Sequence, residues 1–568
     1  MKKTVPPYPL NTPMPNKEAA KWKVWEIMQE KEARNIEDSS LLSNKKYKLF
    51  GILIVFFALL IRLLDLGDRV FHHDESVHAS FTLKLLETGQ YKYNPAYHGP
   101  FLFHTTAVVF RYLGTNDATA RLIPVLFGVA TILLIFLLKD ELGKRGVLWS
   151  AFLLAFSPSM MYFSRFFRND MIIVFCTLAT VVGVTRYLDN LENSKRYEYL
   201  ILAAASLAIA VSSKENAYLI ILIFGAYSGI YLLYRFYSEW QQEKNTLKEA
   251  ISAKKCTISP FLPEILAAGV LFIFIVMFFY TSVFRYHETI FSIVGRAFAH
   301  WMEMHRIERI GGPFYYYIPI LLVYEIPILL FGITGIIYFL KKRDKNTPFF
   351  LFLSYWAVTS LLLYSYLQEK VPWLVVHIVL PFGLLAGAFI GEKISLPGKT
   401  QQKTPSDTED KNFALKEKIT YNGGQSKIKI LLAGVLVLTL IVSLAQCISV
   451  NFYRSMEDDE LMTYTQASPD IRELILKLEG FKGEPENLNM YVIDPNDLYW
   501  PLPWYFRDYE KVSYADKPPM SSKYKAIIVP SEYQMYRELP KEEYDTYNFT
   551  LRPGKEFTLY YNKKLERN

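Results

Sequence analysis

Cysteine is almost absent from this sequence: the 568 residues contain three, Cys176, Cys256 and Cys447, and they lie far apart. Three scattered cysteines give no paired spacing for a disulfide framework, and none belongs to a Cys-x-x-Cys pair typical of structural zinc sites. The zinc-protease signature His-Glu-x-x-His is also missing, because it needs histidines four positions apart, whereas His73 and His78 are five apart. The sequence therefore excludes a disulfide-rich scaffold and a zincin.

Charged residues are scarce over long stretches, and apolar residues fill these stretches. Hydrophobic residues make up 51% of the chain and its mean hydropathy is +0.12, values typical of a protein that crosses a membrane repeatedly. The apolar runs approach about 20 residues, the length needed to cross a hydrocarbon core of about 30 Å. We predict a polytopic α-helical membrane protein with about eleven spans, which are Tyr47–Leu66, Arg121–Leu138, Val147–Phe163, Met171–Leu188, Tyr199–Ser212, Ala217–Tyr234, Leu262–Phe284, Tyr315–Leu340, Phe349–Leu367, Pro372–Ile390 and Ile428–Val450.

The net charge of +8 is distributed in a way that indicates a membrane partner and not a nucleic acid. Lysine and arginine concentrate in alternate connections between the apolar runs, which all fall on one side of the predicted bundle. By the positive-inside rule this side is cytoplasmic. We therefore expect a multi-pass protein of the plasma membrane with the following parts: a cytoplasmic N-terminal tail at 1–46, a membrane domain at 47–450 with a first external loop at 67–120 and a flexible cytoplasmic linker at 391–427, and an external domain at 451–568.

The last hundred or so residues have a different pattern. Their apolar runs shorten to strand length at Leu488–Ile493, Tyr524–Val529 and Phe557–Tyr561, and a helical pattern covers Ile471–Leu478. Short apolar runs that alternate with amphipathic helices predict a small α/β domain. The aromatic stretch Trp500–Tyr505 favours packing in a core or an interface over a platform for a sugar.

The segment "FHHDESVH", residues 71–78, packs three imidazoles and two carboxylates into eight residues directly after the first span. Carboxylates can abstract protons or hold metal ions, and imidazoles can do both. We predict Asp74 and Glu75 as catalytic carboxylates. The side chains able to hold a divalent cation are Asp74, Glu75, His73 and His78, although their spacing requires no metal. The alternative is a structural hydrogen-bond cluster.

Ionisable residues recur in four loops of the predicted external side: His98 in the first, Arg165, Arg168 and Asp170 in the second, Lys214 and Glu215 in the third, and Glu369 and Lys370 in a later one. Charges at membrane ends are costly unless they are paired, hydrated or functional. Arginine and lysine can bind a phosphate, arginine often through two parallel hydrogen bonds. Snorkelling side chains and local ion pairs are the structural alternative for each pair alone.

The order of these motifs resembles the GT-C superfamily of membrane glycosyltransferases, in its dolichyl-phosphate-mannose protein mannosyltransferase branch. The resemblance lies in the acidic pair Asp74-Glu75 after the first span, in "ARLIPVLFG" at 120–128 and in "SRFFRND" at 164–170. The motifs "FHHDESVHA", "YHGP", "SKEN", "EKVPWL" and "WPLPWYFRDY" further resemble the archaeal flippase activity-associated protein family of N-glycosylation.

This resemblance implies a GT-C-like membrane domain with its active site at the outer face. It implies that Asp74 is a general base or a carboxylate next to a metal, with Glu75 as its companion. It further implies that Arg165 and Asp170 lie near the donor phosphate and the first-loop acid. The pair Lys214-Glu215 resembles a third-loop pair of related lipid-sugar transferases.

We therefore predict transfer of a sugar from a polyprenyl-phosphate donor, dolichyl phosphate in an archaeal protein, to a protein or lipid-linked glycan acceptor outside the membrane. Arg165, Arg168, Lys214 and Lys370 would stabilise the charge that develops on the leaving phosphate. The alternative is a lipid-linked sugar flippase or flippase accessory without chemistry. An oligosaccharyltransferase is less favoured, because the C-terminal region contains no Trp-Trp-Asp-Tyr-Gly motif.

Overall fold

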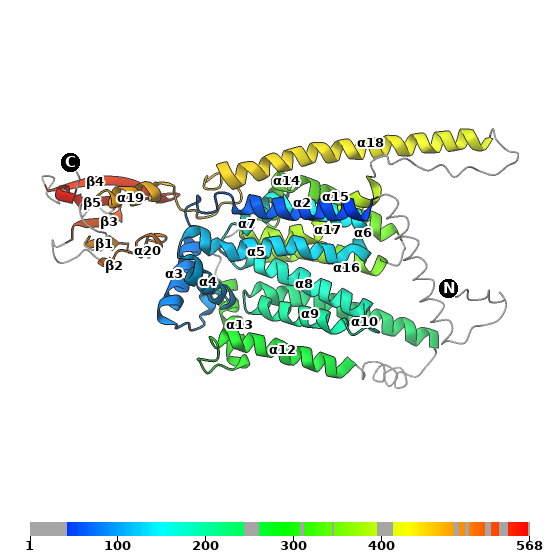
Figure 1. The fold of residues 1–568 in the computed structure, drawn as a ribbon, viewed down its shortest axis with the longest axis horizontal. Coiled ribbons are helices and arrows are strands. Elements are labelled where there is room, and N and C mark those ends of the chain that lie inside the picture. The colour runs from blue at the N-terminus through cyan, green and yellow to red at the C-terminus, as the bar shows by residue number, and fades with distance from the viewer. Residues whose placement is uncertain are drawn as a thin grey trace.

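The computed structural model combines a bundle of long, roughly parallel helices with a small sheet beyond one end of it (Figure 1). The structure describes residues 42–243, 261–306, 312–342, 346–394, 413–481, 488–494, 499–516, 524–532 and 543–565. We call the end of the bundle that faces the sheet the sheet end. The first helix of the bundle, α2 (Asn44–Leu63), reaches the sheet end at its last residues, where the segment "FHHDESVH" follows.

Every apolar run that the sequence indicates contains a helix. The helices of the bundle are α2, α5 (Asp117–Ile135), α6 (Lys139–Ala155), α7 (Pro158–Ser164), α8 (Asp170–Asp189), α9 (Arg196–Val211), α10 (Asn216–Glu243), α12 (Leu262–Tyr280), α14 (Tyr317–Tyr324), α15 (Ile326–Lys341), α16 (Thr347–Tyr366), α17 (Val375–Lys393) and α18 (Phe413–Ile448). Among the described residues, seven helical stretches are long and apolar enough to cross a membrane, or eight if the bent pair α14 and α15 is one span. The fold class is confirmed, and eleven spans stay a prediction.

Helix α17 forms the centre of the bundle. Its residues are buried on every side except near the last turn, which explains why its sequence is apolar all round. Glycines let it approach α6: a Cβ atom on Gly387 would lie 2.2 Å from Ser150 Oγ, and one on Gly391 would lie 2.4 Å from the backbone nitrogen of Gly146. Because α17 begins at the sheet end, its first turns carry side chains into the site described below.

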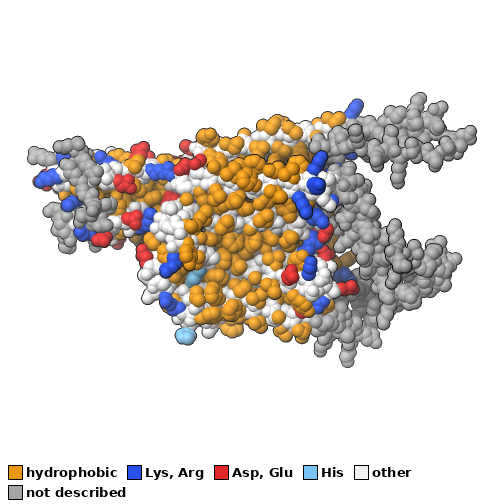
Figure 2. Space-filling view, in the orientation of Figure 1, with side chains coloured by type: hydrophobic (Ala, Val, Ile, Leu, Met, Phe, Trp, Pro, Cys, Tyr) orange, Lys and Arg blue, Asp and Glu red, His pale blue; other side chains and the backbone are white. Residues whose placement is uncertain are grey.

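The surface of the bundle is apolar, as expected of a protein in a bilayer. Figure 2 shows a broad hydrophobic face, with Lys, Arg, Asp and Glu side chains gathered near its two ends. Three shorter helices lie toward the sheet end: α3 (His73–Thr88), α4 (Phe101–Leu113) and α13 (Ile290–Arg306). Helices α3 and α4 belong to the long loop that the sequence predicts at 67–120.

The C-terminal sheet has five strands in the order β2-β1-β3-β5-β4. The strands are β1 (Met490–Ile493), β2 (Val512–Ala515), β3 (Ala526–Pro530), β4 (Tyr544–Arg552) and β5 (Lys555–Asn562). Strands β2, β1 and β3 are parallel, whereas β5 pairs antiparallel with β3 and with β4. Helix α19 (Asp470–Glu479) packs its apolar side against the sheet. The predicted small α/β domain is therefore confirmed.

The cytoplasmic linker at 391–427 stays a prediction, and helix α18 covers its second half. Of these residues the structure describes 391–394 and 413–427, and α18 begins at Phe413. The residues after Phe413 are good helix formers, and each of the two glycines at 423–424 costs a helix only about 1 kcal/mol. The helix that begins as a span at Ile428 can therefore extend backward through them.

The C-terminal domain is bound to the loop before α3. Gln466 donates to the carbonyl of Val70 at 2.8 Å, and the backbone N–H of Phe71 donates to the hydroxyl of Tyr505 at 2.8 Å. Trp504, in the short helix α20 (Leu502–Tyr505), has no exposed surface, packs against Phe71 and donates to Asp117 at 2.7 Å. Trp504 is thus an interface residue, as the sequence predicts. The domain fixes the backbone that leads into Asp74.

Candidate active site

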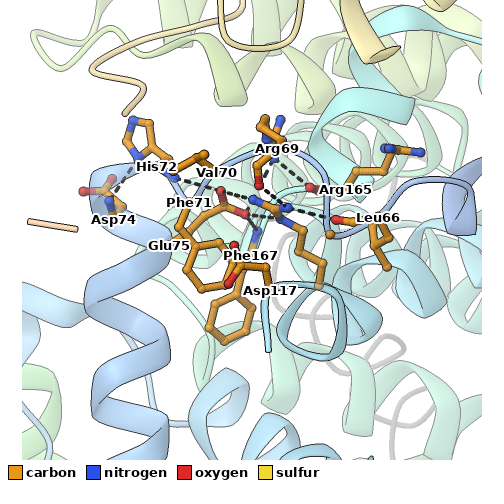
Figure 3. Close-up of polar contacts among 12 residues, drawn as sticks. Leu66, Arg69, Val70, Phe71, His72, Asp74, Glu75, Asp117, Arg165 and Phe167 are labelled. Carbon is orange, nitrogen blue, oxygen red and sulfur yellow. Dashed lines mark hydrogen bonds and ion pairs between the residues drawn. The ribbon is translucent and has the colours of Figure 1, made fainter. Parts of the chain in front are cut away.

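The candidate site is built around the first turn of α3. His72 is the N-cap of this helix: its ring accepts from the backbone N–H of Asp74, while Glu75 accepts from the backbone N–H of His72. This reciprocal capping box starts the helix at His73. Because successive helical residues are about 100° apart around the axis, Asp74 and Glu75 point in different directions, as Figure 3 shows. Their surroundings are different as well.

Glu75 lies in a closed ion-pair network. Arg121 donates from Nε and Nη2 to its two carboxylate oxygens, each at 2.8 Å, and the backbone N–H of Phe167 donates at 2.7 Å. Arg69 Nη2 lies 3.6 Å from Oε1. Burial alone would raise the pKa of Glu75, but the two guanidinium groups and the hydrogen bonds lower it to about 2.

Glu75 has no exposed surface. It therefore has no contact face for a substrate, and its partners leave no oxygen for a metal ion. The role of Glu75 as a second catalytic carboxylate is corrected to a positioning role: it ties α3 to α5 and to the turn that carries Arg168. We call Glu75, Arg69 and Arg121 the Glu75 network.

Asp74 points away from this network and keeps 29% of its side chain exposed, where it forms an ion pair with Arg168 Nη1. Arg168 is buried and lies in the turn between α7 and α8. Its Nη2 donates to His98 Nε2 at 3.1 Å, and its Nε lies 3.7 Å from Asp170 Oδ2. Its guanidinium stacks on the ring of Trp373 at 4.1 Å.

A second, deeper layer lies behind Arg168. Lys214 Nζ donates to both oxygens of Asp170, at 2.9 and 3.2 Å, and His377 Nε2 lies 3.6 Å from Oδ1 of the same carboxylate. All three side chains are buried. Burial lowers the pKa of Lys214, an effect that Asp170 opposes. Asp170 also begins α8, where a negative charge is favourable at the helix N-terminus.

His98 joins this cluster from the loop between α3 and α4. Its Nδ1 lies 2.8 Å from Glu215 Oε2, and its Nε2 lies 3.1 Å from Arg168 Nη2. The loop reaches this position because residue 99 is glycine: a Cβ there would lie 2.3 Å from the carbonyl oxygen of Ser212. Burial would raise the pKa of Glu215, but His98 lowers it.

Six of the predicted site residues therefore meet. They come from four separate parts of the chain, and we call them the Asp74 cluster: Asp74, His98, Arg168, Asp170, Lys214 and Glu215. Glu369 is exposed at the edge of this cluster, and its charge opposes the burial that lowers the pKa of Arg168.

Two predicted phosphate ligands have other partners. Arg165 donates from Nη1 to the carbonyls of Ile61 and Leu64, at 3.0 and 2.5 Å, and from Nη2 to that of Asp65 at 3.1 Å. Arg165 therefore caps the C-terminal end of α2, where helix carbonyls lack partners, and its predicted place beside the donor phosphate is corrected. Lys370 is buried and donates to the carbonyl of Leu367 at 2.9 Å.

The three histidines of the segment "FHHDESVH" make structural contacts. His72 contacts the carbonyl of Tyr464 and lies 3.0 Å from the Thr465 hydroxyl, and His73 lies 3.1 Å from Arg552 Nη1, so both bind the C-terminal domain. His78 Nδ1 donates to the carbonyl of Asp74 at 2.6 Å. Burial lowers the pKa of all three, to about 3 for His72, about 4 for His73 and about 3 for His78.

The predicted metal ligands do not form a metal site. Asp74, Glu75 and His73 each face an arginine, and His78 uses Nδ1 within its own helix. Within the described part of the chain, no three His, Cys, Asp or Glu side chains come close enough together to hold a metal ion. A cation would have to displace guanidinium groups, so the arrangement does not fit one.

Four residues of the site were missed by the sequence analysis: Arg69, Arg121, Trp373 and His377. Arg121 and His377 were detectable in principle, because each is an ionisable residue within an apolar run, and such residues are costly unless they serve a function or have a partner. Arg69 and Trp373 carry no such signal, since charged and aromatic residues at span ends are ordinary membrane anchors.

Comparisons with known proteins agree with this architecture. Residues 69–292 match the sequence model of the family described as dolichyl-phosphate-mannose-protein mannosyltransferase. This segment contains all six residues of the Asp74 cluster and the three of the Glu75 network. No curated protein sequence matches the chain.

Among solved structures, the chain resembles ArnT from Cupriavidus metallidurans bound to undecaprenyl phosphate, with a TM-score of 0.57, 14% identity, and coverage of 91% of this chain and 99% of that one. The Archaeoglobus fulgidus oligosaccharyltransferase AglB in complex with an inhibitory peptide and a dolichol-phosphate gives a TM-score of 0.47 at 14% identity, covering 85% of this chain and 69% of that one. The S. cerevisiae Pmt1-Pmt2 complex bound to the sugar donor gives 0.34 at 20% identity, covering 44% and 36%.

The fold of the chain is therefore similar to that of ArnT. The mannosyltransferase match covers the Asp74 cluster and the Glu75 network but less than half of the chain.

Proposed function

We propose that this protein transfers a glycosyl group from a polyprenyl-phosphate donor to an acceptor at the sheet end of the bundle, which is the external face of the membrane. One observation carries the proposal: Asp74 is a partly exposed carboxylate in contact with a buried arginine, and Lys214 lies directly behind that arginine. A base and two phosphate-binding cations therefore meet at one membrane end.

The reaction would be a single displacement. An acceptor hydroxyl or amide attacks the anomeric carbon of the sugar, and its proton passes to the Asp74 carboxylate. The bond between the anomeric carbon and the phosphate oxygen breaks, and its electron pair stays on the lipid phosphate. The new glycosidic bond and the lipid monophosphate are the products, and Asp74 later releases its proton to water.

Arg168 and Lys214 would stabilise the leaving phosphate. Their buried positions make each charge act in a low dielectric, where stabilisation of a developing negative charge is commonly worth several kcal/mol. The Trp373 ring stacks on the guanidinium and Asp170 lies beside it, so both hold it in place. Glu369 and Lys370 lie on the adjacent loop and would bind the outer part of the donor.

The family match supports a dolichyl-phosphate-linked sugar as donor, and the bound lipid in the ArnT structure supports a polyprenyl phosphate in general. The acceptor would be a protein or a lipid-linked glycan. The C-terminal domain rests on the loop before α3, beside the exposed side of Asp74, so it would help to select this acceptor. Protein glycosylation or assembly of cell-surface glycans is the process we propose.

The variant Asp74→Asn tests the proposal. It keeps the size of the side chain but removes the proton acceptor, so we expect glycan transfer in cells to fall by about 100-fold or more while the protein remains in the membrane. The control is Glu87→Gln, which removes one carboxylate from the exposed far end of the same helix. Unchanged glycans in cells that contain Asp74→Asn would refute the assignment.

A flippase without chemistry is the second candidate, and one observation favours it. Glu325 is fully buried at the 107° break between α14 and α15, where Ser157 and Ser159 bind one of its oxygens. Buried carboxylates at broken membrane helices occur in transporters. Measuring both glycan transfer and lipid flipping in vesicles separates the two functions. In Asp74→Asn, an enzyme loses transfer, whereas a flippase retains transport.

A further inference from the structure

The guanidinium of Arg168 has partners at both Nη atoms and on its flat face, whereas its Nε makes no hydrogen bond within the described residues. Nη1 pairs with Asp74, Nη2 donates to His98 at 3.1 Å, Nε lies 3.7 Å from Asp170, and the flat face covers Trp373. A phosphate binds arginine best through two parallel hydrogen bonds from one edge of the fork. Arg168 therefore has to give up one of these partners before it can bind a phosphate in that way.

The partners differ in how easily they can leave. Asp170 is 1% exposed and is held by Lys214 and His377, so it cannot move into water. His98 is fixed by Glu215 and by the glycine loop that follows it. Asp74 has 29% of its side chain exposed and can rotate into solvent without breaking another side-chain contact. Asp74 is therefore the partner that a phosphate would displace.

The same pairing occupies Asp74, because one of its carboxylate oxygens is held by Arg168 Nη1. In the present arrangement Asp74 is thus restrained by the group that would bind the donor. Asp74 and the donor phosphate both bind Arg168, and only one of them can do so at a time.

We propose that Asp74 and the donor phosphate compete for Arg168, so that binding of the lipid phosphate releases Asp74 to act as the base. The inference rests on the proposed function and adds an order to it: the donor binds first, and the acceptor is deprotonated only afterwards. When the sugar has been transferred and the lipid monophosphate leaves, Asp74 gives its proton to water and returns to Arg168.

Binding of the lipid phosphate alone tests this competition. The purified full-length protein in detergent is titrated with dolichyl monophosphate and, separately, with undecaprenyl monophosphate. Asp74→Asn removes the competitor, so Arg168 is available to the phosphate in a larger fraction of the protein molecules. We therefore expect the Kd for the lipid phosphate to fall about fivefold. Glu87→Gln removes the same charge from the same helix, away from Arg168, and should leave the Kd unchanged.

A double-mutant cycle separates competition from simple charge repulsion. In an Arg168→Gln background, Asp74→Asn should change the Kd less than about twofold, because the shared partner is gone. An equal tightening in both backgrounds, or no tightening in the wild-type background, overturns the competition. If Arg168→Gln abolishes lipid binding, the competition is judged from the Kd values of Asp74→Asn and Glu87→Gln in the wild-type background. A wild-type protein that binds neither lipid phosphate refutes the proposed function itself, and so this outcome differs from a failed competition.

Discussion

The first turn of α3 carries two carboxylates, Asp74 and Glu75, and their surroundings are opposite. Glu75 has no exposed surface and is held by Arg121, Arg69 and the backbone of Phe167. Its neighbour Asp74 keeps 29% of its side chain exposed and has one arginine partner. One carboxylate therefore stabilises the fold, and the other is available for chemistry.

The difference comes from what each side of the helix faces. Glu75 faces α5 and the turn before α8, where two arginines would otherwise be buried without a counter-charge. Breaking a buried pair by removing one partner is strongly destabilising, by about 3–5 kcal/mol. Asp74 faces the meeting point of several loops, where water can reach it.

The largest effect is expected from Glu75→Gln. It leaves Arg121 and Arg69 buried with no carboxylate, so we expect a loss of about 3–5 kcal/mol of stability, seen as a lower unfolding temperature in detergent and a lower yield from membranes. Asp74→Asn should cost less stability than Glu75→Gln, because Asp74 is partly exposed and Arg168 keeps Asp170 and His98 beside it. Equal destabilisation of the two variants would contradict the division of roles.

A second pair of variants extends the comparison to the two arginines of the "SRFFRND" turn. Arg168→Lys keeps the charge but loses the fork that binds a phosphate, so glycan transfer should fall by about tenfold or more. Arg165→Lys loses contacts with the end of α2, so stability should fall by about 1–2 kcal/mol and transfer per folded molecule should not change. Transfer rates normalised to folded protein check both expectations, and an Arg165→Lys enzyme with full stability but no transfer would reverse the assignment.

The attachment of the C-terminal domain can be weakened at Asp117, which accepts from Trp504 and from Tyr505, each at 2.7 Å. Asp117→Asn leaves one of these buried donors without its charged acceptor, at a cost of about 1–3 kcal/mol. We expect faster proteolysis at the 451–470 segment and a reduced transfer rate. The control Asp508→Asn changes a carboxylate that is 76% exposed beside the same helix. Identical proteolysis of the two variants would show that Asp117 does not hold the domain.

The smallest effect is a pH dependence of this attachment. Burial lowers the pKa of His72 to about 3 and that of His73 to about 4, from 6.5, and Arg552 of the C-terminal domain contributes to the lowering for His73. Between about pH 4 and 6.5 the undocked state binds more protons than the docked state, so docking is strongest above pH 6.5 and weakens as the pH falls. Unfolding temperatures measured from pH 7 to 4 should show this decline, and His73→Gln should reduce its slope. A decline of the same slope in His73→Gln would exclude a contribution from His73.

Much of the architecture followed from the sequence alone. Apolar runs of span length can only be buried in a bilayer or in a bundle, so the helices and the membrane class were predictable. Short apolar runs indicated β1, β3 and β5, whereas β2 and β4 were not predicted, because β2 is only half-buried and β4 is buried mainly toward its end, so neither has a clear apolar run. The loops that contribute the Asp74 cluster are among those where the sequence places charges at span ends, and such charges need a partner or a function.

What the sequence could not decide is which of two like residues does which task. Asp74 and Glu75 are adjacent acids, and Arg165 and Arg168 are arginines three positions apart in one turn. Their roles depend on partners more than 40 residues away in the chain, such as Arg121 for Glu75 and the carbonyls of α2 for Arg165. The sequence by itself determined the helices, the sheet and the loops that meet. Only the tertiary structure decided which carboxylate is buried and which faces water, because burial and pairing depend on what packs against each side of the turn.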